Sequence, residues 1–367
     1  MKTSLFALAA ASLILITSSS CKKENDDNNN DATNPVSITY TGADYLGSYY
    51  LSVPRYLLCA GAAENKILFA GGTDGGSVNY NNVEIYNTTT GEWTNTQLSE
   101  GRYGLASASC GQKVLFAGGW TSGGYSKAVD IYDAKTGLWT TSELSEARGS
   151  FAAAAAGNKI AIGGGYGGSY STTVDIYNTT TGLWNTAQLS EGRDYLVAAG
   201  AGSKILFGGG STGSLSSSTV DIYDVNTNVW TVDQLSSPRH FLTAVAAGSK
   251  VFFAGGTENS SLSDVVDIYD VTTGTLSVAH LSEARNRLAS ASIGNIVLFA
   301  GGYNNIGISD VVDIYDLNTG NWSSAHLSEA RNFLAGAAIG DKFCFAGGLN
   351  GPDWTDVTNK VDVFKLK

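Results

Sequence analysis

The chain has 367 residues, of which 43% are hydrophobic and 15% charged, and its formal net charge at pH 7 is −11. With 45 glycines and only four prolines, this composition is typical of a globular protein with many tight turns and excludes a disordered chain. The acidic balance disfavours nucleic acid as a partner, because the phosphate backbone binds basic surfaces. The length is large for one ordinary domain, but a repeat fold can fill it as a single closed unit.

Residues 1–20 have the layout of a secretory signal peptide. A single lysine, Lys2, precedes an apolar run over residues 5–16, and three serines separate this run from Cys21. The run is too short for a good membrane-spanning helix, so we expect the signal to be removed from the mature protein. A retained signal anchor is the alternative.

The junction at Cys21 resembles the precursors of bacterial lipoproteins, in which this cysteine is diacylated and becomes the new N-terminus. The resemblance implies lipidation of Cys21 and an outer-membrane location, with the lipid as the only membrane contact. The following letters, KKENDD, are similar to the surface-export signal of Bacteroidota lipoproteins, which implies exposure on the cell surface. Residues 21–40 are charged and rich in asparagine, a composition that predicts a flexible tether.

Residues 41–367 consist of seven copies of one unit with a period of roughly 46 residues. A Gly-Gly pair marks each copy, and an arginine lies 16 residues before each pair. The first glycines of the pairs are Gly71, Gly118, Gly164, Gly209, Gly255, Gly301 and Gly347. The arginines are Arg55, Arg102, Arg148, Arg193, Arg239, Arg285 and Arg331. A V-[DE]-[IV]-[YF] segment follows each pair, and a tryptophan comes nine residues after its acid in five of the six complete copies.

Each unit divides into four short segments that we expect to be strands. The first is small and apolar (FLAGAAIG), and the second is a continuous apolar run that ends at the glycines (KILFAGG). The third is β-branched and aromatic (VDIYD), and the fourth alternates after its tryptophan (LWTTSELS). No segment has helical spacing. Four strands in each of seven units predict an all-β fold, a seven-bladed β-propeller with four antiparallel strands per blade.

These residues resemble the Kelch family, which has Arg before the first strand, Gly-Gly at the end of the second, Tyr in the third and Trp at the start of the fourth. The resemblance covers residues 41–367 and implies that first strands line a central channel and fourth strands form the rim. The last unit lacks a fourth strand, so residues 46–52 should complete its blade, with Leu46 in the place of Trp322. This closure would leave no open sheet edge.

The repeated charges are expected to belong to the scaffold. Each repeat arginine is matched by an acid of the V-D-I-Y segment: Glu84, Asp130, Asp175, Asp221, Asp267, Asp313 and Asp362. A ligand site rarely needs seven copies of one residue, so we expect buried ion pairs or backbone contacts. The three cysteines of the repeats, Cys59, Cys110 and Cys344, lie in apolar segments without metal spacing and are expected to be buried free thiols.

The loop between the second and third strands is the candidate binding face. Its spacing, from the first glycine of the pair to the next valine, varies from 10 to 14 residues, and all length variation of the repeats falls there. In Kelch proteins this loop shares its face with the connection from one blade to the next. Variable residues at these two places are the candidate ligand contacts: Trp120, Tyr166, Tyr195, Phe241, Asn286, Arg287, Tyr303, Asn332 and Phe333.

Arg287 is the residue that departs most from the repeat, because it is the only charge among the seven positions two residues after a repeat arginine. An aromatic rim with amides and one arginine can stack sugar rings or hold a peptide that carries a carboxylate. We therefore expect a monomeric binding module for a glycan or a protein. That several of these aromatic residues only cover the channel-side backbone remains open.

Two other functions also remain open. An exported sialic-acid mutarotase is a Kelch relative, and this resemblance implies Arg287 as a carboxylate anchor with Asp194 or Glu283 as an acid. The second is an adhesion or spacer module without a ligand. We expect no cofactor, metal or catalytic residue, because the three histidines form no ligand set and the copper ligands of galactose oxidase, another Kelch-like protein, cannot be assembled here.

Overall fold

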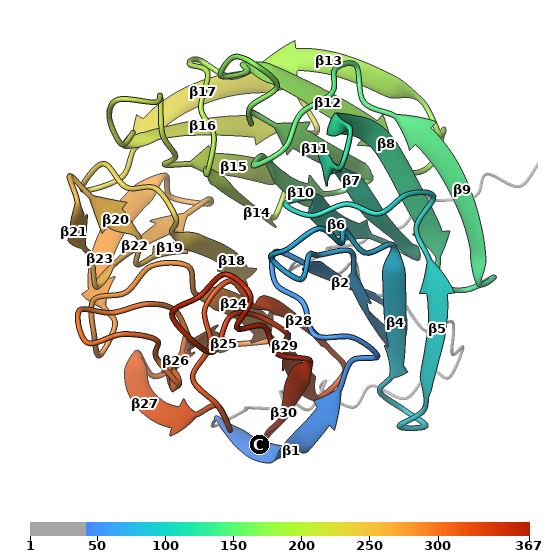
Figure 1. Cartoon of the computed structure of the whole chain (residues 1–367). Coiled ribbons are helices and arrows are strands. Elements are labelled where there is room, and N and C mark those ends of the chain that lie inside the picture. The colour runs from blue at the N-terminus through green and yellow to red at the C-terminus, as the bar shows by residue number, and fades with distance from the viewer. Residues whose placement is uncertain (1–41) are drawn as a thin grey trace, which may run out of the picture.

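In the computed structural model, which describes residues 42–367, seven four-stranded antiparallel sheets form a ring around a central channel (Figure 1). The predicted seven-bladed propeller is thereby confirmed. The predictions for the signal peptide, Cys21 and the tether lie outside the described residues. Between residues 42 and 367, no helix is long and apolar enough to cross a membrane.

Six blades are continuous in the sequence. Blade 1 contains β2 (Cys59–Ala63), β3 (Lys66–Ala70), β4 (Asn82–Asn87) and β5 (Trp93–Gln97), and blade 2 contains β6 (Ala106–Cys110), β7 (Lys113–Thr121), β8 (Gly124–Asp133) and β9 (Leu138–Glu143). Blade 3 contains β10 (Ala152–Ala156), β11 (Lys159–Gly163), β12 (Thr173–Asn178) and β13 (Trp184–Gln188), and blade 4 contains β14 (Val197–Ala201), β15 (Lys204–Gly208), β16 (Thr219–Asp224) and β17 (Val229–Gln234). Blade 5 contains β18 (Thr243–Ala247), β19 (Lys250–Ala254), β22 (Val265–Asp270) and β23 (Thr275–His280), with a small hairpin of β20 (Thr257–Glu258) and β21 (Ser261–Leu262) in its loop. Blade 6 contains β24 (Ala289–Ile293), β25 (Ile296–Ala300), β26 (Val311–Asp316) and β27 (Asn321–His326).

Blade 7 joins the two ends of the described chain. It contains β28 (Ala335–Ile339), β29 (Lys342–Ala346) and β30 (Lys360–Leu366), and its outer strand is β1 (Ala43–Tyr50). The predicted closure of the ring is confirmed, but the expected alignment of Leu46 was wrong. A bulge between Tyr45 and Gly47 leaves Leu46 without a partner, so Tyr45 pairs with Phe364 and takes the place of the repeated tryptophan.

The first strands are built of small residues because seven of them converge on the axis. Strand β10, for example, is a run of five alanines. At Gly200 an added Cβ would lie 1.9 Å from the carbonyl oxygen of Ala155 in the neighbouring blade. A cavity of about 170 Å³ remains on the axis, lined by Ala, Gly, Ser and Val side chains of these strands.

The core lies between the blades. Second strands are buried on both faces, and Phe207 of β15 packs against blade 3 while Phe253 of β19 packs against blade 4. As expected, Cys59 and Cys344 are buried free thiols, and burial raises the pKa of Cys59 to about 12. The side chain of Cys110 is also buried.

The ring closure yields a test of stability. Deleting residues 43–50 exposes the outer edge of β30 and removes the contact between Tyr45 and Phe364. We expect the Tm to fall by roughly 10 °C or more, since a chain of this size loses only a few degrees per kcal/mol. Circular dichroism melting measures this, with a chain that starts at residue 42 as the control. An unchanged Tm for the deletion would contradict closure by β1.

Candidate functional site

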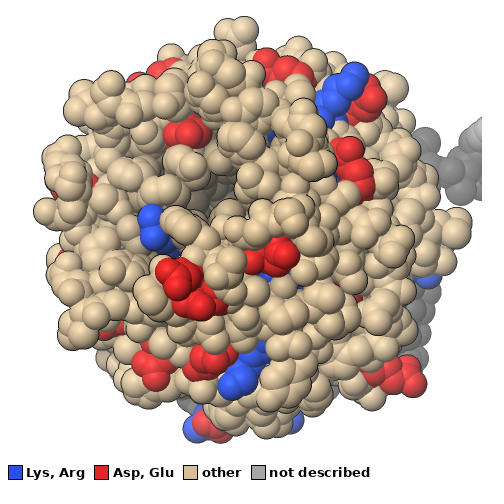
Figure 2. All heavy atoms as spheres, viewed as in Figure 1, with Lys and Arg blue, Asp and Glu red and all other residues tan. Residues whose placement is uncertain are grey.

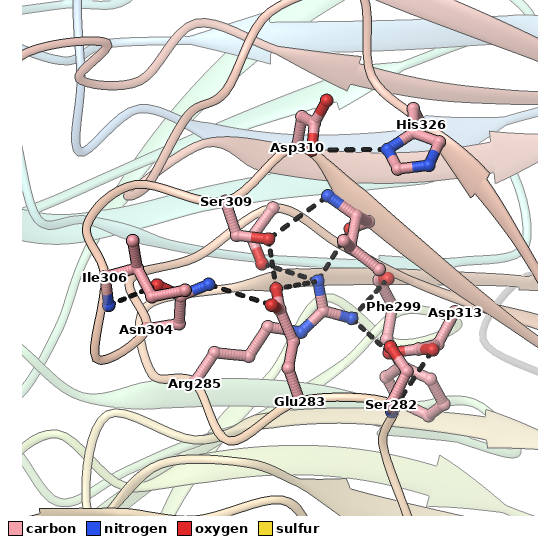
Figure 3. A network of polar contacts seen from close by, with 12 residues as sticks. Ser282, Glu283, Arg285, Phe299, Asn304, Ile306, Ser309, Asp310, Asp313 and His326 are labelled. Carbon is pink, nitrogen blue, oxygen red and sulfur yellow. Dashed lines mark hydrogen bonds and ion pairs between the residues drawn. The ribbon is translucent and has the colours of Figure 1, made fainter.

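Each blade is held by a buried ion pair between its repeat arginine and acid, which blade 6 illustrates (Figure 3). The Arg285 guanidinium donates to Asp313 Oδ2 at 2.5 Å and to three backbone carbonyls of its own blade. Asp313 Oδ1 accepts the backbone N–H of Ser282, which follows the last strand of blade 5, so the carboxylate also joins two blades. The equivalent pairs are Arg55–Glu84, Arg102–Asp130, Arg148–Asp175, Arg193–Asp221, Arg239–Asp267 and Arg331–Asp362.

Glu283, one of the two acids considered for catalysis, is committed to the same joint. It accepts hydrogen bonds from Ser309 and, at 2.8 Å, from Asn304 Nδ2, both in the loop of blade 6 (Figure 3). Burial lowers the pKa of Arg285, and the charges of Asp313 and Glu283 oppose that shift. A Ser or Thr hydroxyl donates an equivalent hydrogen bond to each of four other glutamates: Glu100, Glu146, Glu191 and Glu329.

The Gly-Gly pairs are required because the next blade lies directly against them. Gly255 and Gly256 have φ angles of 66° and 104°, and an added Cβ on Gly255 would lie 2.4 Å from the carbonyl oxygen of Arg285. Gly256 N donates to that same carbonyl at 2.9 Å. This hydrogen bond recurs between every pair of adjacent blades, including blades 7 and 1. The repeated residues are therefore structural.

The mouth of the channel is formed by the residues two positions after each repeat arginine. All seven have φ between 49° and 60°, in the left-handed region: Leu57, Gly104, Ser150, Tyr195, Phe241, Arg287 and Phe333. Six of their N–H groups donate to the carbonyl of the equivalent residue in the preceding blade. We call these seven residues the mouth ring. For a residue other than glycine this conformation costs roughly 1–2 kcal/mol, so the six residues of the mouth ring that have side chains are in a strained conformation.

Arg287 lies between two aromatic rings of the mouth ring. Its guanidinium carbon is 5.2 Å from the Phe241 ring centroid and 4.7 Å from that of Phe333. Among the described residues, no carboxylate pairs with this guanidinium and no group accepts a hydrogen bond from it, whereas all seven repeat arginines are ion-paired. Burial lowers the pKa of Arg287, but an arginine stays charged at neutral pH.

A cavity of about 230 Å³ opens at the mouth, and Arg287, Tyr195, Phe241 and Phe333 line it. Figure 2 shows the hollow at the centre of this face, surrounded mostly by uncharged side chains. The cavity thus brings together four of the nine candidate ligand contacts. It combines apolar walls with one cation, a combination typical of small-ligand sites.

Two further candidates, Asn286 and Asn332, are buried beside the mouth ring. They are 7% and 4% exposed, and the Oδ1 atom of each has no hydrogen-bond partner among the described residues. Asn286 Nδ2 donates to Thr257 Oγ1 at 2.8 Å. An unsatisfied buried oxygen costs roughly 1–3 kcal/mol. Neither asparagine is among the residues that line the cavity.

The remaining candidates, Trp120, Tyr166 and Tyr303, are not among the residues that line the cavity. Each follows a Gly-Gly pair and bridges to the residue after a repeat arginine: Tyr103, Gly149 and Asn286 respectively. The predicted shared face of the loops and blade connections is therefore confirmed.

Several aromatic residues beside these candidates were not predicted from the sequence. Tyr125 lies 4.3 Å from Trp120, Tyr170 lies 5.1 Å from Tyr166, and Trp354 lies 6.2 Å from Phe333, measured between ring centroids. Tyr170 and Trp354 lie in the loops of variable length and Tyr125 lies at the start of β8, and no repeat spacing marks any of the three. Their large side chains were the only available signal.

Asp194 is a buried carboxylate at the fourth blade connection. It is 8% exposed, and among the described residues no cation pairs with it. Burial raises its pKa to about 6. Its charge is also one cause, after burial, of the raised pKa of Tyr170 in the adjacent loop.

The histidines do not converge. His240 follows Arg239 and its Nδ1 is 2.8 Å from Ser216 Oγ, while His280 and His326 lie on outer strands. Burial, helped by the charge of Arg287, lowers the pKa of His240. Within residues 42–367, no three His, Cys, Asp or Glu side chains are grouped closely enough to hold a metal ion.

Comparison with known families identifies two matching segments. Residues 51–195 match the KLHDC2/KLHL20/DRC7 Kelch-repeats domain, and residues 284–325 match the Kelch motif. The first segment spans the whole of blades 1–3, and the second spans nearly all of blade 6. None of the curated proteins compared with the chain matches it.

The raised pKa of Asp194 predicts a pH-dependent stability. The folded protein holds this proton more tightly than the unfolded chain, so ionisation destabilises the fold as the pH rises from about 4 to about 6. We expect Asp194→Asn to stabilise the protein at pH 7.5 by about 2 kcal/mol and to have little effect at pH 4. Urea unfolding at both pH values measures this, with the exposed Glu143→Gln as the control. Equal stability of Asp194→Asn and wild type at pH 7.5 would contradict it.

Proposed function

Since the chain is a seven-bladed propeller of Kelch repeats, we propose that it is a binding module that holds a carboxylate-bearing ligand at the mouth of its channel. Kelch propellers generally mediate interactions with other proteins. The cavity at the mouth ring, together with the variable loops around it, offers the ligand a concave and mostly uncharged surface (Figure 2).

The state of Arg287 carries this proposal. A cation held between two rings, in the wall of a cavity and without a carboxylate of its own, is poised to pair with an anion from outside. The backbone conformation of Arg287 also supports a binding role. Glycine is the least strained residue at a φ of 55°, yet this position holds an arginine.

The neighbouring groups define what else the ligand must present. Ser150 and Tyr195 line the cavity together with Arg287 and carry hydroxyl groups, so the ligand should present hydroxyl or amide groups near its carboxylate. Tyr195 and Tyr303, 40% and 42% exposed, offer aromatic faces at the edge of the mouth. A glycan and a protein segment both supply these groups.

We also propose where the module acts. The sequence around Cys21 supports lipidation of this residue and attachment to the outer membrane, with the propeller on the cell surface at the end of the tether. Closure of the ring by β1 leaves no blade incomplete, which supports a monomer.

Arg287→Gly separates the proposed binding role from a structural one. Glycine relieves the positive φ, so we expect a Tm within about 4 °C of the wild type. Glu64→Gly, which relieves a φ of 57° in the turn between β2 and β3 and does not line the cavity, is the matched control. On an array of carboxylate-bearing and neutral glycans and of peptides with free or amidated ends, the wild type should bind a carboxylate probe. Its affinity should fall more than about tenfold in Arg287→Gly and less than about twofold in the control. Equal binding by Arg287→Gly, or binding to neutral probes alone, would contradict the proposal.

A second candidate function is a mutarotase-type activity, and the observation that favours it is the buried, unpaired Asp194 with a pKa of about 6. A carboxyl group with such a pKa transfers protons efficiently near neutral pH. NMR measures the interconversion of the anomers of a sugar acid. We expect acceleration by the wild type and its loss in Asp194→Asn. A wild-type rate equal to that in buffer would eliminate this function.

A further inference from the structure

Trp120 belongs to a set of three residues that depart from the repeat together. It is the only tryptophan among the seven residues that follow a Gly-Gly pair. Gly104 is the only glycine in the mouth ring, and Gly149 is the only glycine among the residues that directly follow a repeat arginine. Both glycines lie against the Trp120 side chain.

The two glycines make room for the indole. A Cβ on Gly149 would lie 2.5 Å from Trp120 Nε1, and a Cβ on Gly104 would lie 3.2 Å from Trp120 Cδ1. The rings of Tyr103 and Tyr125 hold it from other sides, at centroid distances of 6.2 and 4.3 Å. The indole is thus fixed, half-buried, over a part of the mouth ring that lacks side chains.

This seat lies across the channel from Arg287. Gly104 leads into blade 2 and Gly149 into blade 3, whereas Arg287 leads into blade 6, half the ring away. Gly104, Ser150 and Arg287 nevertheless line the same cavity of about 230 Å³. The indole therefore borders the mouth on one side while the guanidinium borders it on the other.

Resting on the proposed function, we infer that Trp120 is the second wall of the ligand site and that the ligand is a sugar acid in its closed-ring form. The carboxylate of such a sugar pairs with the Arg287 guanidinium. The apolar C–H face of the ring lies near the indole.

The backbone at the mouth favours a sugar over a peptide. An extended peptide commonly binds by adding a strand to a free sheet edge. At this face, however, the residue after each repeat arginine is already bridged to the residue after a Gly-Gly pair in all seven blades. Of the residues that line the cavity, Arg287 carries the only charge, and its guanidinium matches a carboxylate on a compact ring rather than a strand that would add to a sheet edge.

Three variants of the full chain test this inference. Trp120→Ala removes the platform. Gly149→Ala displaces it, because the φ of Gly149 is not positive and the new Cβ would lie 2.5 Å from the indole but 3.4 Å from the backbone of Gly119. Gly123→Ala, in the same blade and with no atom closer than 3.6 Å, is the matched control. The probes are methyl β-D-glucuronide, methyl β-D-glucoside, the open-chain acid D-gluconate and a short acidic peptide, each titrated by calorimetry.

We expect the wild type to bind the glucuronide more tightly than the other three probes. Trp120→Ala and Gly149→Ala should weaken glucuronide binding about fivefold to tenfold, with gluconate unchanged and Gly123→Ala like the wild type. Equal binding of glucuronide and gluconate, unaffected by Trp120→Ala, would overturn the role of Trp120. Tightest binding of the peptide, dependent on Arg287 but not on Trp120, would overturn the sugar acid while the proposed function stands. Binding that does not depend on Arg287 would overturn the proposed function itself.

Discussion

The structure depends on one buried interaction, the pair formed by the repeat arginine and the acid of the third strand. Burying two charges is costly, and the cost is offset only where both are hydrogen-bonded. Here the guanidinium also meets backbone carbonyls of its own blade, and the carboxylate accepts an N–H from the end of the preceding one. Each pair therefore fixes the second and third strands of a blade and the distance of that blade from the preceding one.

The position of the mouth ring follows from this joint. Because each arginine is immobilised and its carbonyl accepts a hydrogen bond from the preceding Gly-Gly pair, the residue two positions later must turn at a positive φ. Side chains at these seven positions are thus directed by the scaffold but not used by it. Variation there does not disturb the joint, so a leucine, a glycine and an arginine occupy equivalent sites on one ring.

The candidate site is accordingly an exception within a uniform framework. Arg287 differs from the seven repeat arginines in its lack of a carboxylate, and Asn286 and Asn332 differ from most buried amides in their unsatisfied oxygens. Trp120 differs from its equivalents in the two glycines beneath it. These departures gather at one end of the channel.

The sequence by itself determined the seven blades, their four strands, the arginine–acid pairing and the closure by the N-terminal strand, because each leaves a mark of fixed spacing that is repeated seven times. It also singled out Arg287 as a break in the pattern. The bulge that puts Tyr45 in place of Leu46, the positive φ of the mouth ring and the seat of Trp120 were decided only by the tertiary structure. They depend on contacts between residues of different blades, such as Gly149 and Trp120, which no local spacing records.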